Sequence, residues 1–544
     1  MRPSPPEAGC GAPLQRWHLQ PAPQPGAVPG RPGHLRLRLR LRLRAVSLAS
    51  GVLWGPLALA QTANLATTQP RSLAVQPSAS ITQTFTDNFL LSGVDPTADA
   101  ITRLSAAVSL KSQTGLVRGF LDYSLSSLVH ARHSDRNTLQ NALNMVLGAD
   151  VIDGRARIDV TGTIAQSAVS AFGVQPVTGS GVQSNSTETR NLRITPSVRG
   201  PLGADYRYSG QLGYAITDAK GVSLGNSSTS SAALHLEPTS RGLLGWALDG
   251  SLLRSDYKAG RATSDDRLYG TANLRIPSVD LLLQANGGVE VSDITAASRQ
   301  SYGNWGLGAT WAPSPRTRLV ADYNHRFYGP SRSLSFEHRT ALTTWRLTDS
   351  RSLSTDNGQL TDSGRGTAFD LFYAQAASAV PDPVRRVDYV NALLQALGIS
   401  PTAEPGFLRS SVTLQQRQEL SVALRGVRSA AVVSVTRSLT QRLGAQPGVT
   451  DDLSATSEVR LHGLSVNLSH RLTPMSTATA LLSQSQGTGV GAAQHTKQRL
   501  LSLQYTNRPG NNSDLSLGLR RAAYQQFPAS FGESAIFATY GVRF

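Results

Sequence analysis

The stretch LNMVLGADVIDGRARIDVTGTI, residues 143–164, decides the fold. Apolar side chains recur at every second position on both sides of Asp153-Gly154, a dipeptide that favours a tight type I′ hairpin turn. Alternation with period two gives a strand one apolar and one polar face. The apolar positions are Leu143, Met145, Leu147, Ala149, Val151, Ile158, Val160 and Ile164. The stretch therefore predicts an antiparallel hairpin with one apolar face and one polar, water-facing face.

The same alternation recurs along most of the chain, in segments such as 206–216, 319–327, 412–424, 464–472, 501–505 and 515–519. We count about 22 such segments, an even number between 18 and 24, because strands of about 10 residues with connections fit this spacing. Two points stay open. Asn286-Gly287 is either a turn or the middle of a strand, and residues 331–354 are either one strand or two.

The connections between these segments alternate in length. Tight connections such as Asp153-Gly154, Pro277-Ser278 and Thr473-Pro474 are followed by longer polar ones, at residues 92–98, 168–187, 218–227, 258–265, 444–451, 485–495 and 525–533. Short turns on one rim and long loops on the other are typical of a transmembrane antiparallel β-barrel. A soluble sandwich would not require this alternation. The fold class predicted is therefore all-β, with a barrel over residues 79–544.

Composition supports this class. The chain has 544 residues, of which 16% are charged, against about 25% in typical soluble proteins, and this low fraction argues against a cytosolic enzyme. Mean hydropathy is −0.19, and no apolar run after residue 60 approaches the ~20 residues of a membrane-spanning helix. In hydrocarbon every backbone polar group needs an internal partner, so only helices or closed barrels can span a membrane.

The N-terminal residues have the three parts of a secretory signal peptide. Residues 36–44 alternate Arg and Leu, and Ala45–Ala60 is uncharged and ends in Ala-Leu-Ala. We expect residues 1–60 to be an extension plus signal, cleaved after Ala60, and residues 61–78 to be a short periplasmic lead-in. A membrane anchor is disfavoured because the run is short and contains Pro56. Cleavage would also remove Cys10, the single cysteine, and reduce the net charge from +17 to +10, since eight arginines and Glu7 are lost. The remaining charge is spread along the chain, so we expect no nucleic-acid partner.

The chain closes with ESAIFATYGVRF, residues 533–544. A barrel without a free edge must pair its last strand with its first. A terminal strand that ends on an aromatic residue resembles the assembly signal of bacterial outer-membrane barrels, which implies the barrel-assembly machinery as a partner. The signal residues are Ile536, Ala538, Tyr540, Val542 and Phe544, and Phe537 falls on the opposite face. We expect Trp246, Trp305, Trp311 and Trp345 to anchor interfacial girdles, with ordinary packing as the alternative.

One segment departs from the strand pattern. Asp382 is a good N-cap, Pro383 suits the first helical position, and apolar residues recur every three to four positions up to Leu397. The pattern predicts an amphipathic helix at 381–398, inside an insertion at residues 357–407. The insertion either folds into the lumen as a plug, caps the outer rim, or packs as a simple loop helix.

No residue constellation indicates catalysis, a cofactor or a resident metal. Adjacent acids such as Asp265-Asp266 and Asp451-Asp452 are more typical of solvated loops than of glycan hydrolysis. His130 and His133 lack a third metal ligand of matching spacing, which favours solvated loop histidines. A denser set of charges forms a candidate lumen ladder, made of Arg316, Arg318, Asp322, Arg326, Glu337 and Arg339. This ladder either binds an anionic or sugar-like polymer or stabilises the barrel wall by holding its strands together.

Four segments resemble the PEP-CTERM system-associated outer-membrane protein family: Ser80–Leu91, Tyr302–Gly329, His338–Thr340 and Asp382–Gly398. The likeness covers residues 75–544, and Trp311–Gly329 is its most specific part. The resemblance implies a β-barrel in the outer membrane of a Gram-negative bacterium, associated with exosortase and exopolysaccharide production. It implies no enzyme activity and assigns no functional residue. The extension ahead of the signal is a departure from the family.

The sequence therefore predicts a non-enzymatic barrel that contacts outer-membrane lipid. It would act as a conduit or anchor for export or surface assembly of polysaccharide or sorted proteins, with exopolysaccharide or its export components as partners. The alternative is a structural or adhesive surface barrel whose lumen is filled.

Overall fold

The computed structural model describes residues 73–113, 116–174, 185–240, 242–355, 367–377, 380, 383–397, 407–444, 451–490, 494–510, 512–526 and 529–544. The chain divides into two units, Met1–Thr67 and Thr68–Phe544, and all described residues belong to the second. The expected signal and cleavage site lie outside the described residues.

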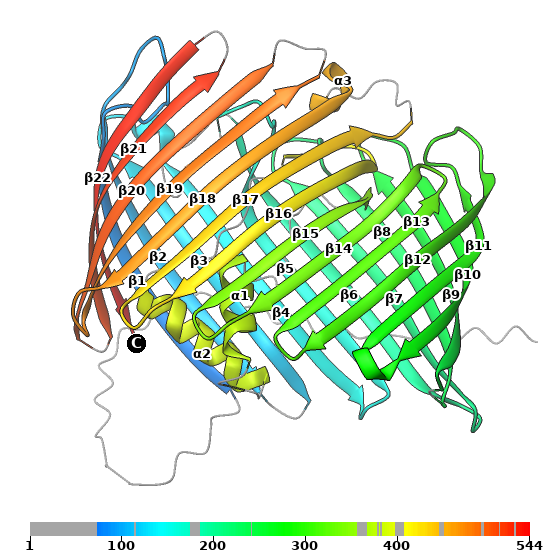
Figure 1. Cartoon of the computed structure of the whole chain (residues 1–544). Helices are drawn as coiled ribbons and strands as arrows, with labels where there is room; N and C mark the ends of the chain where they lie inside the picture. Colours follow the sequence, from blue (N-terminus) through cyan, green and yellow to red (C-terminus); the bar gives the residue numbers. More distant parts are fainter. Residues whose placement is uncertain are drawn as a thin grey trace, which may run out of the picture. The chain divides into compact units, whose positions relative to one another are not determined.

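The second unit is a closed antiparallel barrel, in which the described residues form 22 strands (Figure 1). Each strand pairs with the next, and β1 pairs with β22, so the sheet has no free edge. The strands are β1 Leu73–Thr86, β2 Asp99–Gln113, β3 Val117–His130, β4 Thr138–Ile152, β5 Ala156–Ala168, β6 Ser186–Leu202, β7 Tyr206–Ala219, β8 Ser227–Pro238, β9 Leu244–Tyr257, β10 Thr263–Ile276, β11 Leu281–Ser292, β12 Gln300–Ser314, β13 Thr317–Arg326, β14 Gly329–Arg339, β15 Thr343–Ser354, β16 Thr413–Arg425, β17 Ser429–Arg442, β18 Glu458–Arg471, β19 Ser476–Gly489, β20 His495–Gly510, β21 Ser513–Gln526 and β22 Ala529–Arg543. The predicted fold class and the even strand number are confirmed.

Several boundaries differ from expectation. The barrel begins at Leu73, inside the segment 61–78 that was expected to precede it. β11 runs unbroken through Asn286-Gly287, and residues 331–354 divide into β14 and β15. The connection expected at 525–533 is wrong, because β21 extends to Gln526 and β22 starts at Ala529. At Leu73, at Asn286-Gly287 and at the β21–β22 connection, cross-strand pairing extends a strand over residues that read locally as a turn or loop.

The two faces of the wall follow the alternation. On β7, Leu212, Tyr214 and Ile216 point outward and are 61%, 47% and 41% exposed, whereas Arg207 lies on the inner face. All four tryptophans of the expected girdles point outward, with exposed fractions of 42–50%. Trp246, Trp311 and Trp345 lie near one end of their strands, and Trp305 lies nearer the other. The outer face is thus an apolar surface with aromatic side chains toward both ends.

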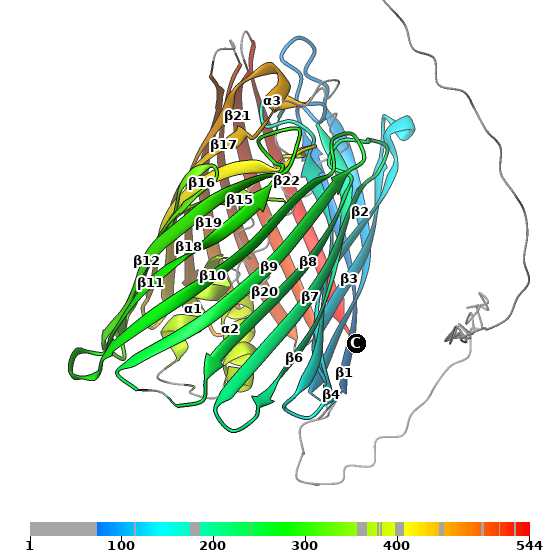
Figure 2. The ribbon, with the colours of Figure 1, turned by 90° about the vertical axis from the view of Figure 1, so that its right-hand side faces the viewer.

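The two rims differ as predicted. One rim carries short turns, such as Asp153–Arg155, where Gly154 takes φ +65°, a left-handed conformation that glycine adopts without steric cost. We call it the short-turn rim; β1 starts there and β22 ends there. The opposite rim, which we call the long-loop rim, carries the longer connections, including 87–98, 169–185, 355–412 and 443–457 (Figure 2). A two-residue connection at Phe327–Tyr328 is an exception on that rim.

The described helices are short. They are α1 Thr367–Ala376, α2 Pro383–Leu397, α3 Asp452–Ala455 and the 3₁₀ turns η1 Ser134–Arg136 and η2 Pro277–Val279. Within the described ranges, no helix has the length and apolar character needed to cross a membrane. α2 matches the described part of the helix predicted at 381–398, and α1 was not predicted.

The pairing of the last strand explains why Phe537 lies on the opposite face from the other apolar residues of the terminal segment. Ile536, Ala538, Tyr540 and Val542 share the outward face of β22, with Ile536 59% exposed. Phe537 points inward opposite Gly518 of β21, where the ring occupies the space that a Cβ at residue 518 would need. An aromatic ring over a strand glycine restores packing that the glycine lacks. The amide of Phe544 donates to the Pro77 carbonyl at 2.9 Å, so the carboxyl end is held to β1.

A buried ion pair stabilises the seam between first and last strands. Arg520 of β21 contacts both carboxylate oxygens of Glu533 of β22, at 2.6 and 3.2 Å, and the Thr86 hydroxyl of β1 donates to Glu533 at 2.9 Å. The side chains of Arg520 and Glu533 are 7% and 1% exposed. Three strands are therefore joined through one carboxylate.

We expect Glu533→Gln to lower the free energy of unfolding by about 3 kcal/mol, because removing one partner leaves a buried charge uncompensated. Asp514→Asn is the matched control on the same two strands. Asp514 pairs with Arg543 at 3.0 Å, but both side chains are 27% exposed, and such pairs contribute at most about 1 kcal/mol. Urea unfolding of the protein in lipid vesicles measures both changes, and equal losses would contradict this role of the seam pair.

Candidate functional site: the lumen and its obstructions

The inner wall carries the candidate ladder, but its members have different partners. Arg318, Asp322 and Arg326 share the inner face of β13, and Glu337 and Arg339 share the inner face of β14. Arg318 lies opposite Glu337 in the strand register. Arg316 lies in the turn between β12 and β13, and its carbonyl accepts from the Arg339 amide. The structure therefore brings five of the six residues to one wall without making them a single network.

Arg326 belongs to a different cluster, near the long-loop rim. Its guanidinium contacts Glu290 of β11, with Nε 2.9 Å from Oε1, and reaches Asp265 of β10 at 2.7 Å. The Arg326 side chain is 15% exposed, while those of Glu290 and Asp265 are 0% and 7% exposed. The ring of Tyr328 lies 5.2 Å from the guanidinium. Sequence reasoning missed Glu290 and Asp265 as partners because they lie 36 and 61 residues from Arg326.

The adjacent acids are not catalytic pairs. Asp265 points inward to Arg326, whereas Asp266 points outward and pairs with Arg299. Neighbouring strand residues face opposite sides of the sheet, so these two carboxylates cannot act on one bond. Asp451 pairs with Arg442, and Asp452 accepts from the Ser170 hydroxyl at 2.8 Å and the Ala171 amide at 2.6 Å. Both loop carboxylates hold loops together.

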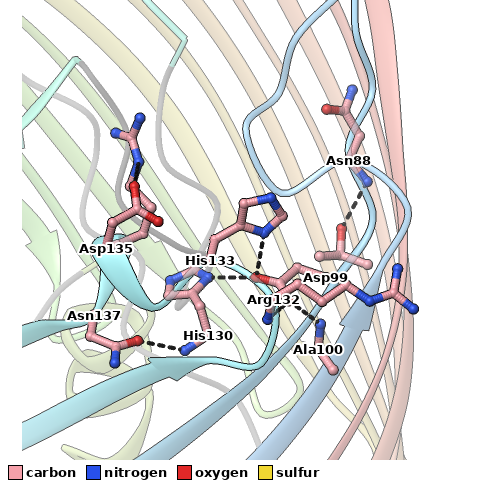
Figure 3. A network of polar contacts seen from close by, with 10 residues as sticks. Asn88, Asp99, Ala100, His130, Arg132, His133, Asp135 and Asn137 are labelled. Carbon is pink, nitrogen blue, oxygen red and sulfur yellow. Dashed lines mark hydrogen bonds and ion pairs between the residues drawn. The ribbon is translucent and has the colours of Figure 1, made fainter.

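The sequence favoured solvated histidines, but His130 is buried and His133 only partly exposed, and the two join loops at the long-loop rim (Figure 3). The Nδ1 atoms of His130 and His133 lie 3.0 and 3.3 Å from the same Asp99 oxygen, and His130 is 2% exposed. The ring of Phe89 lies 5.3 and 4.6 Å from the two imidazoles. Tertiary contacts from the 87–98 loop bury His130 and partly cover His133, which local sequence does not reveal. In the described part of the chain, no group of three or more His, Cys, Asp or Glu residues is arranged to hold a metal ion.

The described helices of the insertion, α1 and α2, lie in the lumen (Figures 1 and 2). Phe369 and Phe372 of α1 and Val390 and Leu394 of α2 form an apolar cluster, which packs against the inward-facing Ala423, Ala430 and Val432 of β16 and β17. The Arg339 guanidinium donates to the Ala374 carbonyl at 3.0 Å, and Arg346 lies 3.7 Å from Asp370. These wall residues lie near the short-turn rim, so the insertion reaches deep into the barrel. Of the alternatives left open by the sequence, the lumen position is correct.

The residues that return from the helices to the wall cross the mouth of the lumen. Phe407–Val412, which we call the mouth strap, is buried throughout, with exposed fractions of 1–8%. Phe407 bridges Ala168 at the end of β5, and the Leu408 amide donates to the Ala168 carbonyl at 3.1 Å. The strap then continues into β16. Because β5 and β16 are eleven positions apart in a ring of 22 strands, the strap joins opposite sides of the barrel.

Other loops of the long-loop rim hold the mouth strap in place. Phe407 packs with Ala171, Phe172 and Leu453, and Val412 packs with Tyr257 and Ile294. The Ser410 amide donates to Asp451 at 3.4 Å, and its hydroxyl accepts from the Gly225 amide at 3.4 Å. Burial raises the pKa of the Asp452 carboxyl above its ordinary value, although the hydrogen bonds from Ala171 and Ser170 oppose this effect. The lumen is thus obstructed at two levels, by the strap at the mouth and by the helix pair below.

No family model and no curated protein matches this chain. Several solved structures are similar to it. One is the siderophore receptor PirA from Pseudomonas aeruginosa, with 11% identity over 88% of this chain and 82% of that chain and a TM-score of 0.39. The FrpB iron transporter from Neisseria meningitidis has 10% identity over 86% and 81%, with a TM-score of 0.45. The outer-membrane protein OpdK from Pseudomonas aeruginosa has 10% identity over 87% and 99%, with a TM-score of 0.30. Similarities at this level assign neither substrate nor partner.

The fold itself decides the location. Single-chain antiparallel barrels with an even strand number and an apolar outer band are proteins of the bacterial outer membrane. The chain is an outer-membrane β-barrel. Its short-turn rim is accordingly periplasmic and its long-loop rim extracellular, since these barrels place short turns on the periplasmic side.

We expect Asp452→Ala to loosen the contact between α3 and the 169–185 loop. The substitution leaves the buried Ala171 amide without its acceptor, which costs about 1–3 kcal/mol, and hydrogen exchange at Ala171 and Phe172 should accelerate accordingly. Ser454→Ala is the control, because its hydroxyl is exposed and bonds only locally to the Asp451 carbonyl. Unchanged exchange in Asp452→Ala would show that apolar packing alone holds this loop.

Proposed function

We propose that this barrel is a gated conduit of the outer membrane, closed in the described state by one displaceable insertion. The observation that carries the proposal is the origin of the obstruction. The helix pair and the mouth strap both come from the single connection between β15 and β16, and the inner wall around them is lined largely by polar side chains. Large barrels of about 22 strands enclose a lumen wide enough to hold such a plug.

The insertion can leave the lumen without disturbing the wall. Ser354 and Thr413, the residues that flank the insertion, lie directly opposite each other in the β15–β16 register. Their pairing does not depend on the residues between them. The insertion is held by the contacts of α1, α2 and the strap, whereas the wall is held by its own backbone ladder.

The family resemblance supports a more specific role. We propose that the conduit serves an exopolysaccharide and PEP-CTERM protein-sorting system, passing or anchoring polysaccharide or sorted proteins at the cell surface. The polar inner wall suits a hydrated cargo. No catalytic role is assigned, because the adjacent acids that suggested hydrolysis have other partners.

A structural or adhesive barrel with a filled lumen is the second candidate. It is favoured by the apolar packing of α1 and α2 against Ala423, Ala430 and Val432, three inward-facing residues that form an apolar packing surface on an otherwise polar wall. In that case the insertion would be a permanent part of the wall's support.

We expect the two candidates to differ in planar-bilayer conductance after residues 355–412 are replaced by a four-residue Gly-Ser linker. The unaltered protein should be nearly silent, and the shortened protein should show ohmic steps, because the displaced segment supplies both obstructions. Replacing residues 490–494 by a Gly-Ser linker of equal length is the control and should leave the conductance unchanged. Loss of the folded barrel in the shortened protein, seen as loss of heat-modifiable migration in gels, would support the filled barrel, because in that case the insertion supports the wall.

We expect a deletion strain to export less surface polysaccharide, with the wild-type protein found in the outer-membrane fraction. Re-expression of the full chain should restore export. Unchanged amounts of exported glycan and of sorted surface proteins would remove the proposed system while leaving the barrel and its gate intact.

A further inference from the structure

Charged residues on the outer face of the barrel are distributed unequally between its two ends. On the described strands, every outward-facing Asp, Glu, Lys or Arg, assigned by alternation with exposed apolar neighbours, lies in the half nearer the long-loop rim. Charges near the short-turn rim, such as Arg207, Arg275 and Arg543, fall on the inner face. A lipid-facing charge is costly at the bilayer midplane and much less so near the interface. The outward charges therefore lie on the side of one leaflet, the one at the long-loop rim.

Basic residues dominate this band over one set of neighbouring strands. Arg437 of β17, Arg460 of β18, Lys497 and Arg499 of β20, and Arg521 of β21 form what we call the basic patch. Each is in phase with exposed apolar residues of its own strand, as Arg437 is with Val435, Arg460 with Leu464, Arg499 with Leu501 and Arg521 with Leu519. The single acid among them is Glu458, which pairs with Arg460. The patch thus carries a net positive charge on the membrane-facing surface.

The side chains of the patch are held in place along the wall. Arg499 Nε donates to Gln484 Oε1 of β19 at 3.1 Å, and the Arg521 guanidinium contacts the Ser534 hydroxyl of β22. Arg460, Arg499 and Arg521 remain exposed on the outer face. Arg499 and Arg521 have neutral partners, Gln484 and Ser534, so their guanidinium groups keep donors for an external acceptor.

An apolar groove crosses the same strands obliquely, from Leu424 and Ser429 at the short-turn rim to Phe85 near the long-loop end of β1, and on β20 and β21 it lies directly on the midplane side of the patch. It is lined by outward-facing residues of β16 to β22 and β1, among them Leu468, Ala480, Leu503, Leu519, Ile536 and Phe85. Leu519 is the next outward-facing residue after Arg521, about 7 Å along the strand. Figure 1 shows β17 to β21 side by side on one face of the barrel. A cationic surface above an apolar groove matches a molecule with an anionic head and several acyl chains.

We infer that the basic patch on β17–β21 and the groove beneath it form a docking site for a phosphate-bearing lipid of the outer leaflet. Arginine binds phosphate in a bidentate geometry, and the patch supplies four arginines and a lysine on the side of the leaflet at the long-loop rim. The acyl chains fill the groove. Such a lipid fixes the orientation of this wall in the membrane, and the inference is independent of whether the lumen conducts.

The opposite side of the barrel provides an internal comparison. A second outward groove lies over β4 to β11, lined by residues such as Leu212, Leu234 and Leu252. The outward charges above it are Arg190 and Arg254 together with the acids Glu188, Asp218, Asp256 and Asp266. Since Arg190 already contacts Glu188 at 2.7 Å, this side does not present a net positive surface to phosphate. The two sides thus have similar grooves but differ in the net charge beside them, and this charge is what favours a phosphate-bearing lipid on β17–β21.

The test is lipid retention by the full chain, reconstituted in phosphatidylcholine vesicles that contain lipid A or lipid A stripped of its phosphates. After extraction into mild detergent, native mass spectrometry counts the lipid A that remains bound. We expect the wild-type protein to retain lipid A at least fivefold better than the stripped form, and retention to fall as ionic strength rises because salt screens exposed charges. R499Q/R521Q should lower retention at least fivefold, and R190Q/R254Q should change it less than twofold.

Each other outcome overturns the inference. Equal losses in the two double variants would show that the patch has no special role, and equal retention of the stripped lipid would show that phosphate is not recognised. Displacement of lipid A by millimolar inorganic phosphate would identify a site for the free ion and not for a lipid. Because both double variants keep the outward strand pattern, heat-modifiable migration in gels verifies their folding. If R499Q/R521Q does not fold, the single variants R499Q and R521Q, each compared with R254Q, decide the question.

Discussion

Closure of the sheet is the constraint on which the rest of the molecule depends. In hydrocarbon, each backbone N–H and C=O of a spanning segment needs a partner within the protein, and the pairing of β1 with β22 supplies the last of them. A register error of one residue in any strand would turn its apolar side chains into the lumen. The buried Arg520–Glu533 pair, tied to Thr86, fixes that register at the seam, where the two ends of the barrel unit must meet.

Local sequence predicted the barrel well because the pattern that specifies a lipid-facing strand is itself local. The hairpin at 143–164, the position of its turn and the contrasting rims are confirmed in the structure. The turn is not of type I′, because Gly154 but not Asp153 takes a positive φ. Contacts between distant segments were not predictable in this way. Asp452 bonds residues 281 and 282 positions earlier, and the mouth strap around Ser410 is buried by loops that are distant in sequence, such as those of Gly225 and Asp451. α1 was missed although Phe369, Leu371, Phe372 and Ala376 recur at near-helical spacing, and Ala423, Ala430 and Val432 interrupt an otherwise polar inner face where the helices pack.

The candidate ladder also shows that local sequence predicts which face a residue lies on but not which distant residue it contacts. Alternation placed Arg318, Asp322 and Arg326 on a common inner face, and that face is where they lie. Which acid each arginine meets depends on the shear of the neighbouring strands, so Arg326 pairs with Glu290 and Asp265 on β11 and β10 rather than with Asp322 on its own strand. Inner and outer charges therefore differ in their surroundings: those inside contact the wall and its insertion, while those outside lie in the half of the barrel nearer the long-loop rim.

The crossing of the lumen by Phe407–Val412 also has a mechanical consequence. A cylinder whose wall is one sheet thick resists stretching along its hydrogen bonds but flattens easily, and the wider it is, the more readily lateral pressure from the bilayer makes it oval. The mouth strap is a buried segment that pairs with the end of β5 and continues into β16. It therefore opposes the separation of two strands that lie eleven positions apart in the wall. Without the mouth strap the wall would be free to change its cross-section. The width of any passage through this protein is therefore set jointly by the surrounding lipid and by this short segment.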